Sequence, residues 1–143
     1  MEAPPASSGF GALKGRLPLP TAGRVEVGFG KVVNPKFNTV TVQKGLDIRA
    51  PLGTPVLAVA EGKVAFSRWL RGYGNLMVLD HGDGYHTVLA HLAGLEREIG
   101  EVVQAGEVVG QVGDSGSLKG AYLYFEIRQK GVPTDPSVWL APK

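Results

Sequence analysis

Residues 122–128, YLYFEIR, decide the fold class of this chain, because side chains with a polar group alternate with apolar ones along the whole run. A period of two is typical of a β-strand that buries one of its faces. Shorter runs of valine, leucine, isoleucine and aromatic residues precede this one, and 21 glycines and 10 prolines punctuate them. The pattern predicts an all-β fold of roughly eight to ten strands with almost no helix.

The other strands are predicted from shorter apolar or alternating runs. These runs cover residues 24–29, 45–49, 55–60, 63–69, 75–80, 85–91, 102–103 and 107–112. Two stretches are expected to lie outside the strands. Residues 31–41 are polar and contain Asn34-Pro35, which favours a loop, and residues 93–100 are the only stretch with a helix-like composition.

Length and composition indicate one soluble globular domain. The chain has 143 residues, of which 43% are hydrophobic and 20% are charged. A formal net charge of +2 without a basic run argues against a nucleic-acid partner. Cysteine is absent, so disulfides and thiolate metal sites are excluded. No apolar run reaches the roughly 18 residues of a membrane span, so none is predicted.

The N-terminal stretch predicts the domain organisation. Residues 2–8 are rich in proline, alanine and serine, and no apolar core of a signal peptide follows Met1. We predict a linker and lead-in segment over residues 1–20 and a single folded domain over residues 21–143. The chain is either a cytoplasmic protein with its own start or a piece of a longer secreted protein, and the motifs below favour the second interpretation.

Several short blocks, taken in order, carry a family resemblance. They include QKGLD at 43–47, GYGN at 72–75, LAHL at 89–92 and DPSVW at 135–139, together with YLYFEI at 122–127. Over about residues 23–140 the chain resembles the LytM domain, which belongs to the lysostaphin-type zinc endopeptidases. The resemblance implies a single antiparallel, sheet-rich domain of the duplicated-hybrid-motif type, with an open groove and little helix.

The metal site of that family is altered in this chain. Active members use a His-x-x-x-Asp segment and the second histidine of a His-x-His strand, whose residues i and i+2 share one face. Here Gln43 stands at the first histidine and Tyr122 and Tyr124 stand at the pair, while Asp47 and His91 are kept. An amide is a poor zinc ligand, and a tyrosine must first lose a proton with a pKa of about 10. We therefore expect no zinc, no other cofactor and no catalytic residues.

A second resemblance narrows the function. Residues 10–18, FGALKGRLP, and the strand LYFEIR look like murein hydrolase activators of the EnvC type, in which a degenerate LytM domain stimulates a separate amidase. The implied partner is a periplasmic N-acetylmuramoyl-L-alanine amidase, with peptidoglycan as a second candidate ligand. The implied location is the periplasm or another extracytoplasmic compartment. The partner is expected in the old groove, at Gln43, Asp47, His91, Tyr122 and Tyr124, with Arg71 and Tyr73 on the rim.

Single residues keep alternative interpretations. Asp47 without a metal either caps a loop or pairs with a cation, and His91 is a vestige, a groove contact or a satisfied polar group. The two tyrosines either contact a partner or pack as half-buried strand aromatics. His81 is expected to make a structural hydrogen bond. The rival functions are a zinc endopeptidase with atypical ligands, and a module that binds peptidoglycan without activating an enzyme. A third rival, a lipoyl-type or phosphate carrier, lacks a suitably placed hairpin lysine.

Overall fold

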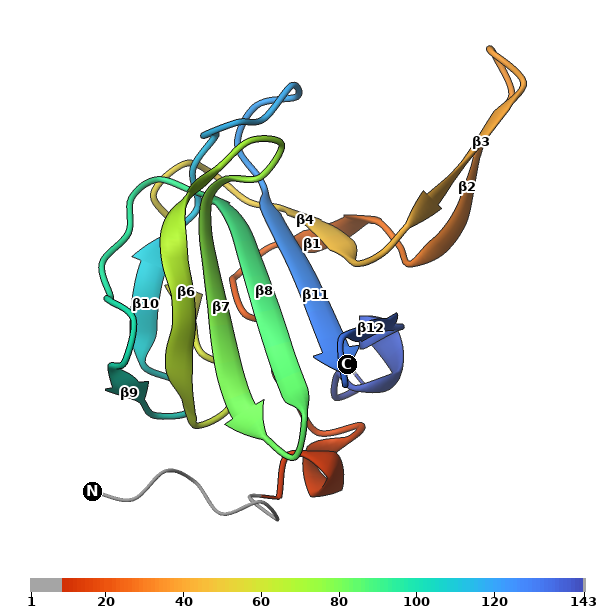
Figure 1. The fold of residues 1–143 in the computed structure, drawn as a ribbon. Coiled ribbons are helices and arrows are strands. Elements are labelled where there is room, and N and C mark those ends of the chain that lie inside the picture. Colours follow the sequence, from red (N-terminus) through yellow and green to blue (C-terminus); the bar gives the residue numbers. More distant parts are fainter. Residues whose placement is uncertain (1–8, 143) are drawn as a thin grey trace.

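The computed structural model describes residues 9–142, which fold almost entirely into antiparallel strands (Figure 1). The strands are β1 (Arg24–Val27), β2 (Gly30–Asn34), β3 (Thr39–Gln43), β4 (Leu46–Arg49), β5 (Pro55–Leu57), β6 (Gly62–Leu70), β7 (Gly74–Gly82), β8 (Tyr85–Leu92), β9 (Val102–Val103), β10 (Val108–Gln111), β11 (Leu123–Gln129) and β12 (Val132–Thr134). Within this range the helical elements are two three-residue 3₁₀ turns, η1 (Gly11–Leu13) and η2 (Pro136–Val138). The all-β prediction is therefore confirmed.

Eight strands form the main sheet. Their order is β1-β4-β11-β8-β7-β6-β9, with β12 paired to β11, and two further sheets are the β2–β3 and β5–β10 ribbons. Successive side chains of β11 point to opposite faces of the sheet. Leu123, Phe125 and Ile127 are fully buried in the main core, whereas Tyr124 packs against a smaller apolar cluster with Tyr73 and Phe66. The sheet therefore has a core face and a second face that remains partly open.

Two local predictions were wrong. Residues 31–41 are largely strand, because β2 and β3 pair with Val33 opposite Val40 and Lys31 opposite Val42. The β-branched side chains of this stretch decide its structure, and Asn34-Pro35 provides only the start of the turn. Residues 93–100 contain no helix. The strands number twelve rather than eight to ten, because β2 and β3 lie in the stretch that was expected to be a loop and the three-residue β12 was not predicted.

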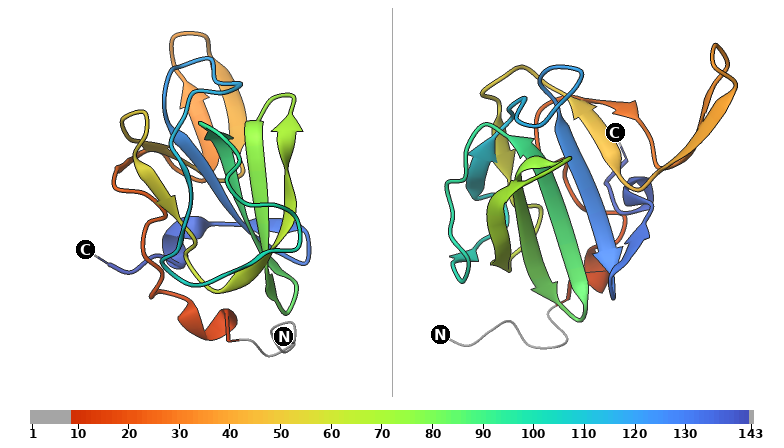
Figure 2. Two further views of the ribbon diagram at one scale, coloured as in Figure 1. Left: turned by 90° about the vertical axis from the view of Figure 1, so that its left-hand side faces the viewer. Right: turned by 45° about the horizontal axis from the view of Figure 1, so that its top comes forward.

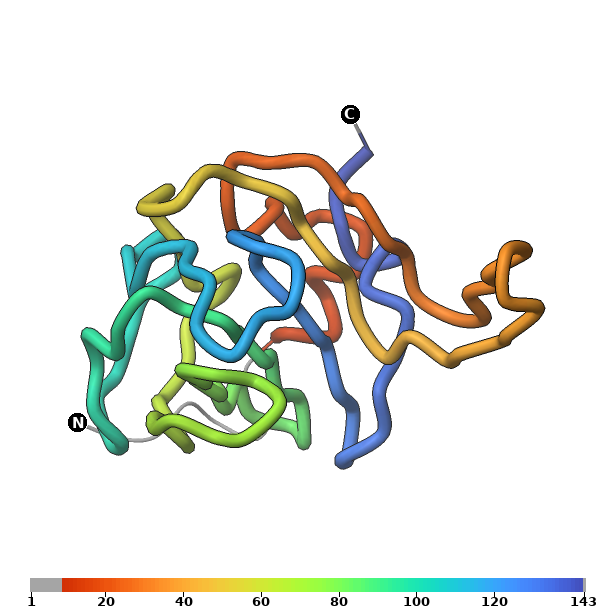
Figure 3. Tube along the Cα trace, turned by 90° about the horizontal axis from the view of Figure 1, so that it is seen from above, coloured from red at the N-terminus to blue at the C-terminus, as the bar shows by residue number. Residues whose placement is uncertain are grey.

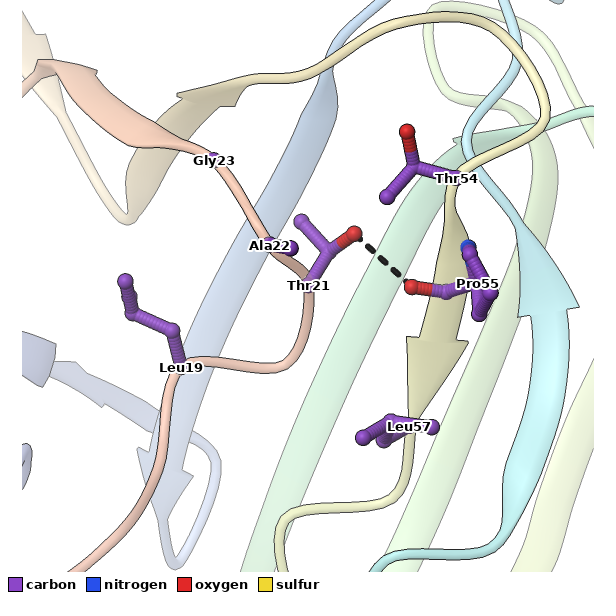
Figure 4. A pocket seen from close by; sticks show the side chains of 7 residues that line it. All are labelled: Leu19, Thr21, Ala22, Gly23, Thr54, Pro55 and Leu57. Carbon is purple, nitrogen blue, oxygen red and sulfur yellow. Dashed lines mark hydrogen bonds between the residues drawn. The ribbon is translucent and has the colours of Figure 1, made fainter.

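The described part of the predicted lead-in segment packs into the domain. Phe10 and Leu17 are each 2% exposed, and the Phe10 ring lies 5.1 Å from the ring of Trp139. Further along, Thr21 donates a hydrogen bond of 2.8 Å to the Pro55 carbonyl and closes the segment onto β5 (Figure 4). Residues 1–8 of the predicted linker lie outside the described residues. The boundary at residue 20 stays a prediction, but packing does not separate residues 9–20 from the core.

Among the described residues, no helix is long and apolar enough to cross a membrane.

His81 has the structural role that its sequence context predicts. The side chain is 1% exposed, and its Nδ1 lies 2.8 Å from the Glu61 carbonyl while its Nε2 lies 2.9 Å from the Thr87 hydroxyl. Phe10 stacks on the imidazole with ring centroids 4.7 Å apart. Burial disfavours the charged imidazolium and lowers the pKa of His81 to about 4. The histidine is therefore a neutral core residue in the folded protein.

This burial predicts a stability that declines in mild acid. Between pH 6.5 and about 4 the unfolded chain binds a proton at His81 that the folded chain does not bind. The free energy of unfolding should therefore fall as the pH decreases through this window, by up to about 3 kcal/mol. Urea titrations of the wild type and of His81→Gln measure the effect, with His86→Gln as the matched control. His81→Gln should lose this part of the decline and His86→Gln should keep it; equal slopes in all three proteins would contradict the assignment.

Candidate functional site

The strand order brings together residues that are far apart in the sequence. β11 lies between β4 and β8, so that Tyr124 pairs with Asp47 on one side and with Ala90 on the other. His91 follows Ala90, at the end of β8. Loop 113–122 passes above these strand ends, between β4 and the β6–β7 turn (Figure 3). The result is an open groove, lined by Val42, Gln43, Lys44, Asp47, Gly72, Tyr73, His91, Tyr122 and Tyr124.

Six of the seven residues expected at the partner site line this groove. The exception is Arg71, which is exposed on the β6–β7 turn next to Gly72 and is absent from the lining. Tyr73 is half-buried and supplies its side chain to the wall, as expected of a rim residue. The structure therefore assembles the predicted cluster, while the binding role of its members stays a prediction.

Asp47 is held by two donors on opposite sides of its carboxylate. Gln43 Nε2 donates to Oδ1 at 2.8 Å, and Lys119 Nζ donates to Oδ2 at 2.6 Å. Asp47 is only 7% exposed, so its charge requires a partner in place of water. Of the two alternatives left open by the sequence, the structure selects pairing with a cation.

The ion pair of Asp47 continues into a four-membered charged network. Lys119 Nζ also donates to Glu26 at 3.0 Å, and Arg49 contacts the same carboxylate through two nitrogens at 2.9 and 3.1 Å. Hydrogen bonds from Arg49 and Lys119 lower the pKa of Glu26 to about 2. Burial lowers the pKa of Lys119, but the hydrogen bonds that Lys119 donates to Asp47 and Glu26 outweigh burial, and the net shift of the pKa is upward. The network therefore pairs two acidic side chains with two basic ones through direct contacts.

His91 is a satisfied polar group that also lines the groove. Its Nδ1 lies 2.8 Å from the Ser115 carbonyl, which can only accept, so Nδ1 carries a proton and donates this bond. Nε2 is then left as an acceptor for the Tyr122 hydroxyl at 3.0 Å. The residue is 5% exposed, with a left-handed backbone at φ 63° and its amide bonded to the Tyr73 carbonyl. Both ring nitrogens are therefore occupied by neighbours.

The two tyrosines occupy different surroundings. Tyr122 lies beneath Lys119, whose Nζ is 4.5 Å from the ring centroid, and burial followed by the charge of Asp47 raises the pKa of its phenol. Tyr124 donates to Glu126, which also accepts from Arg128. Burial and the hydrogen bond to Glu126 raise the pKa of Tyr124 far above its usual range. Both phenols stay protonated and present hydroxyl groups to the groove wall.

The residues of the groove do not fit zinc. Catalytic zinc sites use three protein ligands from histidine, carboxylate or thiolate, and no group of three such residues is gathered anywhere within residues 9–142. Asp47 has both oxygens engaged, and His91 Nε2 is an acceptor already in use. The raised pKa values of Tyr122 and Tyr124 oppose the phenolates that metal binding would need. This donor set supports no metal-dependent step.

The sequence interpretation missed the residues that stabilise the groove. Lys119, Glu26, Arg49 and Ser115 carry the network and the loop contacts, and none was predicted. Lys119 lies 72 residues from Asp47 and 93 from Glu26, so no local spacing links them. The one available signal was Asp47 itself. A carboxylate without a metal is expected to pair with a cation, but the sequence does not identify which one.

Two glycines at the β6–β7 turn show how closely loop 113–120 packs. Gly74 has φ +66°, and a Cβ at this position would lie 2.0 Å from the Ser115 carbonyl oxygen. The Ser115 hydroxyl accepts from the Asn75 amide at 3.0 Å and donates to the Leu92 carbonyl at 2.6 Å. Gly72 has φ +89°, but a Cβ there would meet no atom within 4 Å. Of these two glycines, Gly74 is therefore the one that the approach of the loop requires.

Alanine substitution at Gly72 and at Gly74 should lower the free energy of unfolding by different amounts. Gly72→Ala should lower the free energy of unfolding by about 1 kcal/mol, because it adds only the strain of a positive φ. Gly74→Ala adds an overlap with backbone and should cost at least about twice as much. Denaturant unfolding of the two variants measures the difference. Equal decreases in the free energy of unfolding would mean that the loop moves away from the added methyl group without loss of stability.

Comparisons with known proteins agree with this architecture. The sequence profile of peptidase family M23 matches residues 41–136. DD-carboxypeptidase/endopeptidase Mpg of Neisseria meningitidis is 38% identical over 113 residues, covering 79% of this chain and 26% of the relative. Murein hydrolase activator EnvC of Escherichia coli is 34% identical over 134 residues, covering 94% and 31%. A zinc-containing peptidase from Vibrio cholerae superposes with a TM-score of 0.79 at 30% identity, covering 90% of this chain and 40% of that chain.

These relatives are longer than the chain and differ in their named activities. The chain spans between 26% and 32% of the length of the first curated relatives that it matches. One relative is named for peptidase activity and another for activating a hydrolase, so similarity alone does not assign an activity to this domain. It does assign the family, because the profile covers more than half of the chain. The chain therefore belongs to peptidase family M23 and carries the LytM-type domain that its sequence resembles.

Proposed function

We propose that this chain is a non-catalytic LytM domain that binds and activates a peptidoglycan amidase during cell-wall remodelling and cell separation. The observation that carries the proposal is the engagement of Asp47. Its two carboxylate oxygens hold the Lys119 ammonium at 2.6 Å and the Gln43 amide at 2.8 Å. A lysine side chain thus supplies the positive charge that a metal would supply in an active peptidase.

The chemistry available in the groove supports the absence of catalysis. Peptide hydrolysis by this family's route needs a metal to lower the pKa of a water toward neutrality. His91 cannot act readily as a base, because Nδ1 donates to Ser115 and Nε2 accepts from Tyr122. Tyr122 and Tyr124 hold their protons because burial raises the pKa of both. No described group in the groove is poised to activate water.

The same residues suit a protein partner. Tyrosines combine a large apolar ring with a hydroxyl and are enriched at binding surfaces. Tyr73 and Tyr124 lie with ring centroids 6.2 Å apart along the groove wall. The name of the E. coli relative, a murein hydrolase activator, supports an amidase as the partner, and it supports a periplasmic or otherwise extracytoplasmic location. Peptidoglycan binding without activation is the second candidate, favoured by the retained open groove and by the endopeptidase name of the Neisseria relative.

Addition of the domain should accelerate the N-acetylmuramoyl-L-alanine amidase of the source bacterium on dye-labelled sacculi. Tyr124→Ala and Arg71→Ala should each raise the concentration needed for half-maximal activation by about tenfold, because aromatic and arginine contacts dominate such interfaces. Arg16→Ala, an exposed arginine on the lead-in segment away from the groove, is the matched control. Thermal unfolding of each variant separates lost binding from lost folding.

Two results would count against the proposal. If the wild-type domain sediments with sacculi but leaves the amidase rate unchanged, the peptidoglycan-binding candidate replaces the activator. If Tyr124→Ala and Arg71→Ala activate as the wild type does, the partner surface lies outside the groove.

Zinc should neither bind nor stabilise the domain. After dialysis against zinc and then buffer, elemental analysis should find far less than one equivalent, because Asp47 and His91 are engaged by Lys119 and Tyr122. A specific site at one hundred times its Kd would add about 2.7 kcal/mol to the free energy of unfolding. The unfolding temperature should therefore be the same in zinc and in a chelator. A zinc-dependent rise together with stoichiometric metal would favour an endopeptidase with atypical ligands.

A further inference from the structure

The β2–β3 hairpin projects from the body of the domain beside the groove (Figures 1 and 2). Within residues 9–142 its two strands pair only with each other and add nothing to the main sheet. An isolated hairpin of this kind gains little stability for the fold from its own strand pairing. Its side chains are therefore free to serve another purpose.

One face of the hairpin is apolar and exposed. Residues directly opposite each other in an antiparallel pair share a face, and so do residues two apart. Val33 lies opposite Val40, and Lys31 lies opposite Val42, so these four side chains lie on one face. The three valines are 61%, 59% and 68% exposed, and Phe37 in the turn is 66% exposed. We call Lys31, Val33, Phe37, Val40 and Val42 the hairpin face.

The chain segment that forms the hairpin carries only positive charge. Residues 27–46 include Lys31, Lys36 and Lys44 and contain no aspartate or glutamate. None of the three lysines forms an ion pair within the described residues 9–142. This contrasts with Lys119 and Arg49, which are neutralised by their network. Lys36 Nζ lies 5.6 Å from the centroid of the Phe37 ring. The hairpin therefore presents cations without an ion-pair partner next to exposed apolar side chains.

The hairpin face is continuous with the groove. Val42 and Lys44 line the groove together with Gln43, which reaches Asp47 from the end of β3. From Val42 the apolar side chains run outward through Val40 and Val33. A partner segment that enters the groove would meet this face without leaving the surface of the domain.

We propose that the hairpin face holds a segment of the partner amidase that carries apolar side chains flanked by carboxylates. The proposal rests on the proposed function and adds the chemistry of the partner segment. The apolar side chains would cover Val33, Val40 and Val42, and the carboxylates would pair with the lysines. A second copy of this chain is excluded as the occupant, because two such hairpins would bring like charges together. A protein segment fits the hairpin face better than a lipid surface does. The face leads into a groove, which a segment can follow and a flat membrane cannot.

Removal of the apolar surface tests the proposal. Val33→Thr/Val40→Thr keeps the β-branched shape and strand preference of both residues while making the face polar. Binding of the full-length amidase, measured by titration calorimetry, should weaken about tenfold or more. The matched control is Val102→Thr/Val108→Thr on β9 and β10, at the far side of the domain, where the valines are 37% and 40% exposed (Figure 1). That variant should bind as the wild type does.

Neutralisation of the lysines tests the charge of the partner segment. Lys31→Gln/Lys36→Gln/Lys44→Gln should slow association and flatten the dependence of affinity on salt. An unchanged salt dependence would exclude a carboxylate-bearing occupant.

The remaining outcomes separate this inference from the proposed function. If the valine variant binds the amidase normally while Tyr124→Ala binds weakly, the hairpin inference fails and the groove assignment stands. If the wild-type domain binds no amidase, the proposed function fails and the inference falls with it. Flotation with vesicles of anionic phospholipid gives the third outcome. Vesicle binding that the valine variant loses, without any change in amidase affinity, would reassign the face to a membrane.

Discussion

The pairing of Lys119 with Asp47, at 2.6 Å, is the constraint on which the groove depends. Asp47 is a nearly buried carboxylate in the middle of a strand, and a buried charge without a partner is strongly destabilising. Lys119 lies on the loop of residues 113–120 and forms an ion pair with this carboxylate. The ion pair holds the loop over the strand ends. The position of Ser115 against His91, and the cover over Tyr122, follow from the same placement of the loop.

The pairing also explains how the fold keeps its shape without metal ligands. A zinc ion in such a groove would neutralise the aspartate and connect three strands through its ligands. Here the connection is made by side chains alone, through the series Gln43, Asp47, Lys119, Glu26 and Arg49. Two negative and two positive charges compensate each other, so this network is neutral. The hairpin lysines Lys31, Lys36 and Lys44 have no ion-pair partner within the described chain.

Sequence patterns predicted which side chains share one face of a strand better than they predicted which stretches of the chain form strands. The i, i+2 relation of Tyr122 and Tyr124 correctly placed both in the groove, because a strand repeats every two residues wherever it lies. The same reasoning failed at residues 31–41, where polar Asn34-Pro35 was given more weight than Val32, Val33 and Val40. It also missed β12, which has only three residues and is too short to show any period.

The sequence by itself determined the fold class, and it showed that Gln43, Tyr122 and Tyr124 stand where the family that it resembles has histidines. These are local properties, since alternation and residue identity do not depend on distant contacts. The tertiary structure alone decided what Asp47 and His91 do, because their partners Lys119 and Tyr122 are 72 and 31 residues away. It also decided that the hairpin stays apart from the main sheet with its valines exposed, because strand pairing is settled by competition among all strands and not by the preference of one.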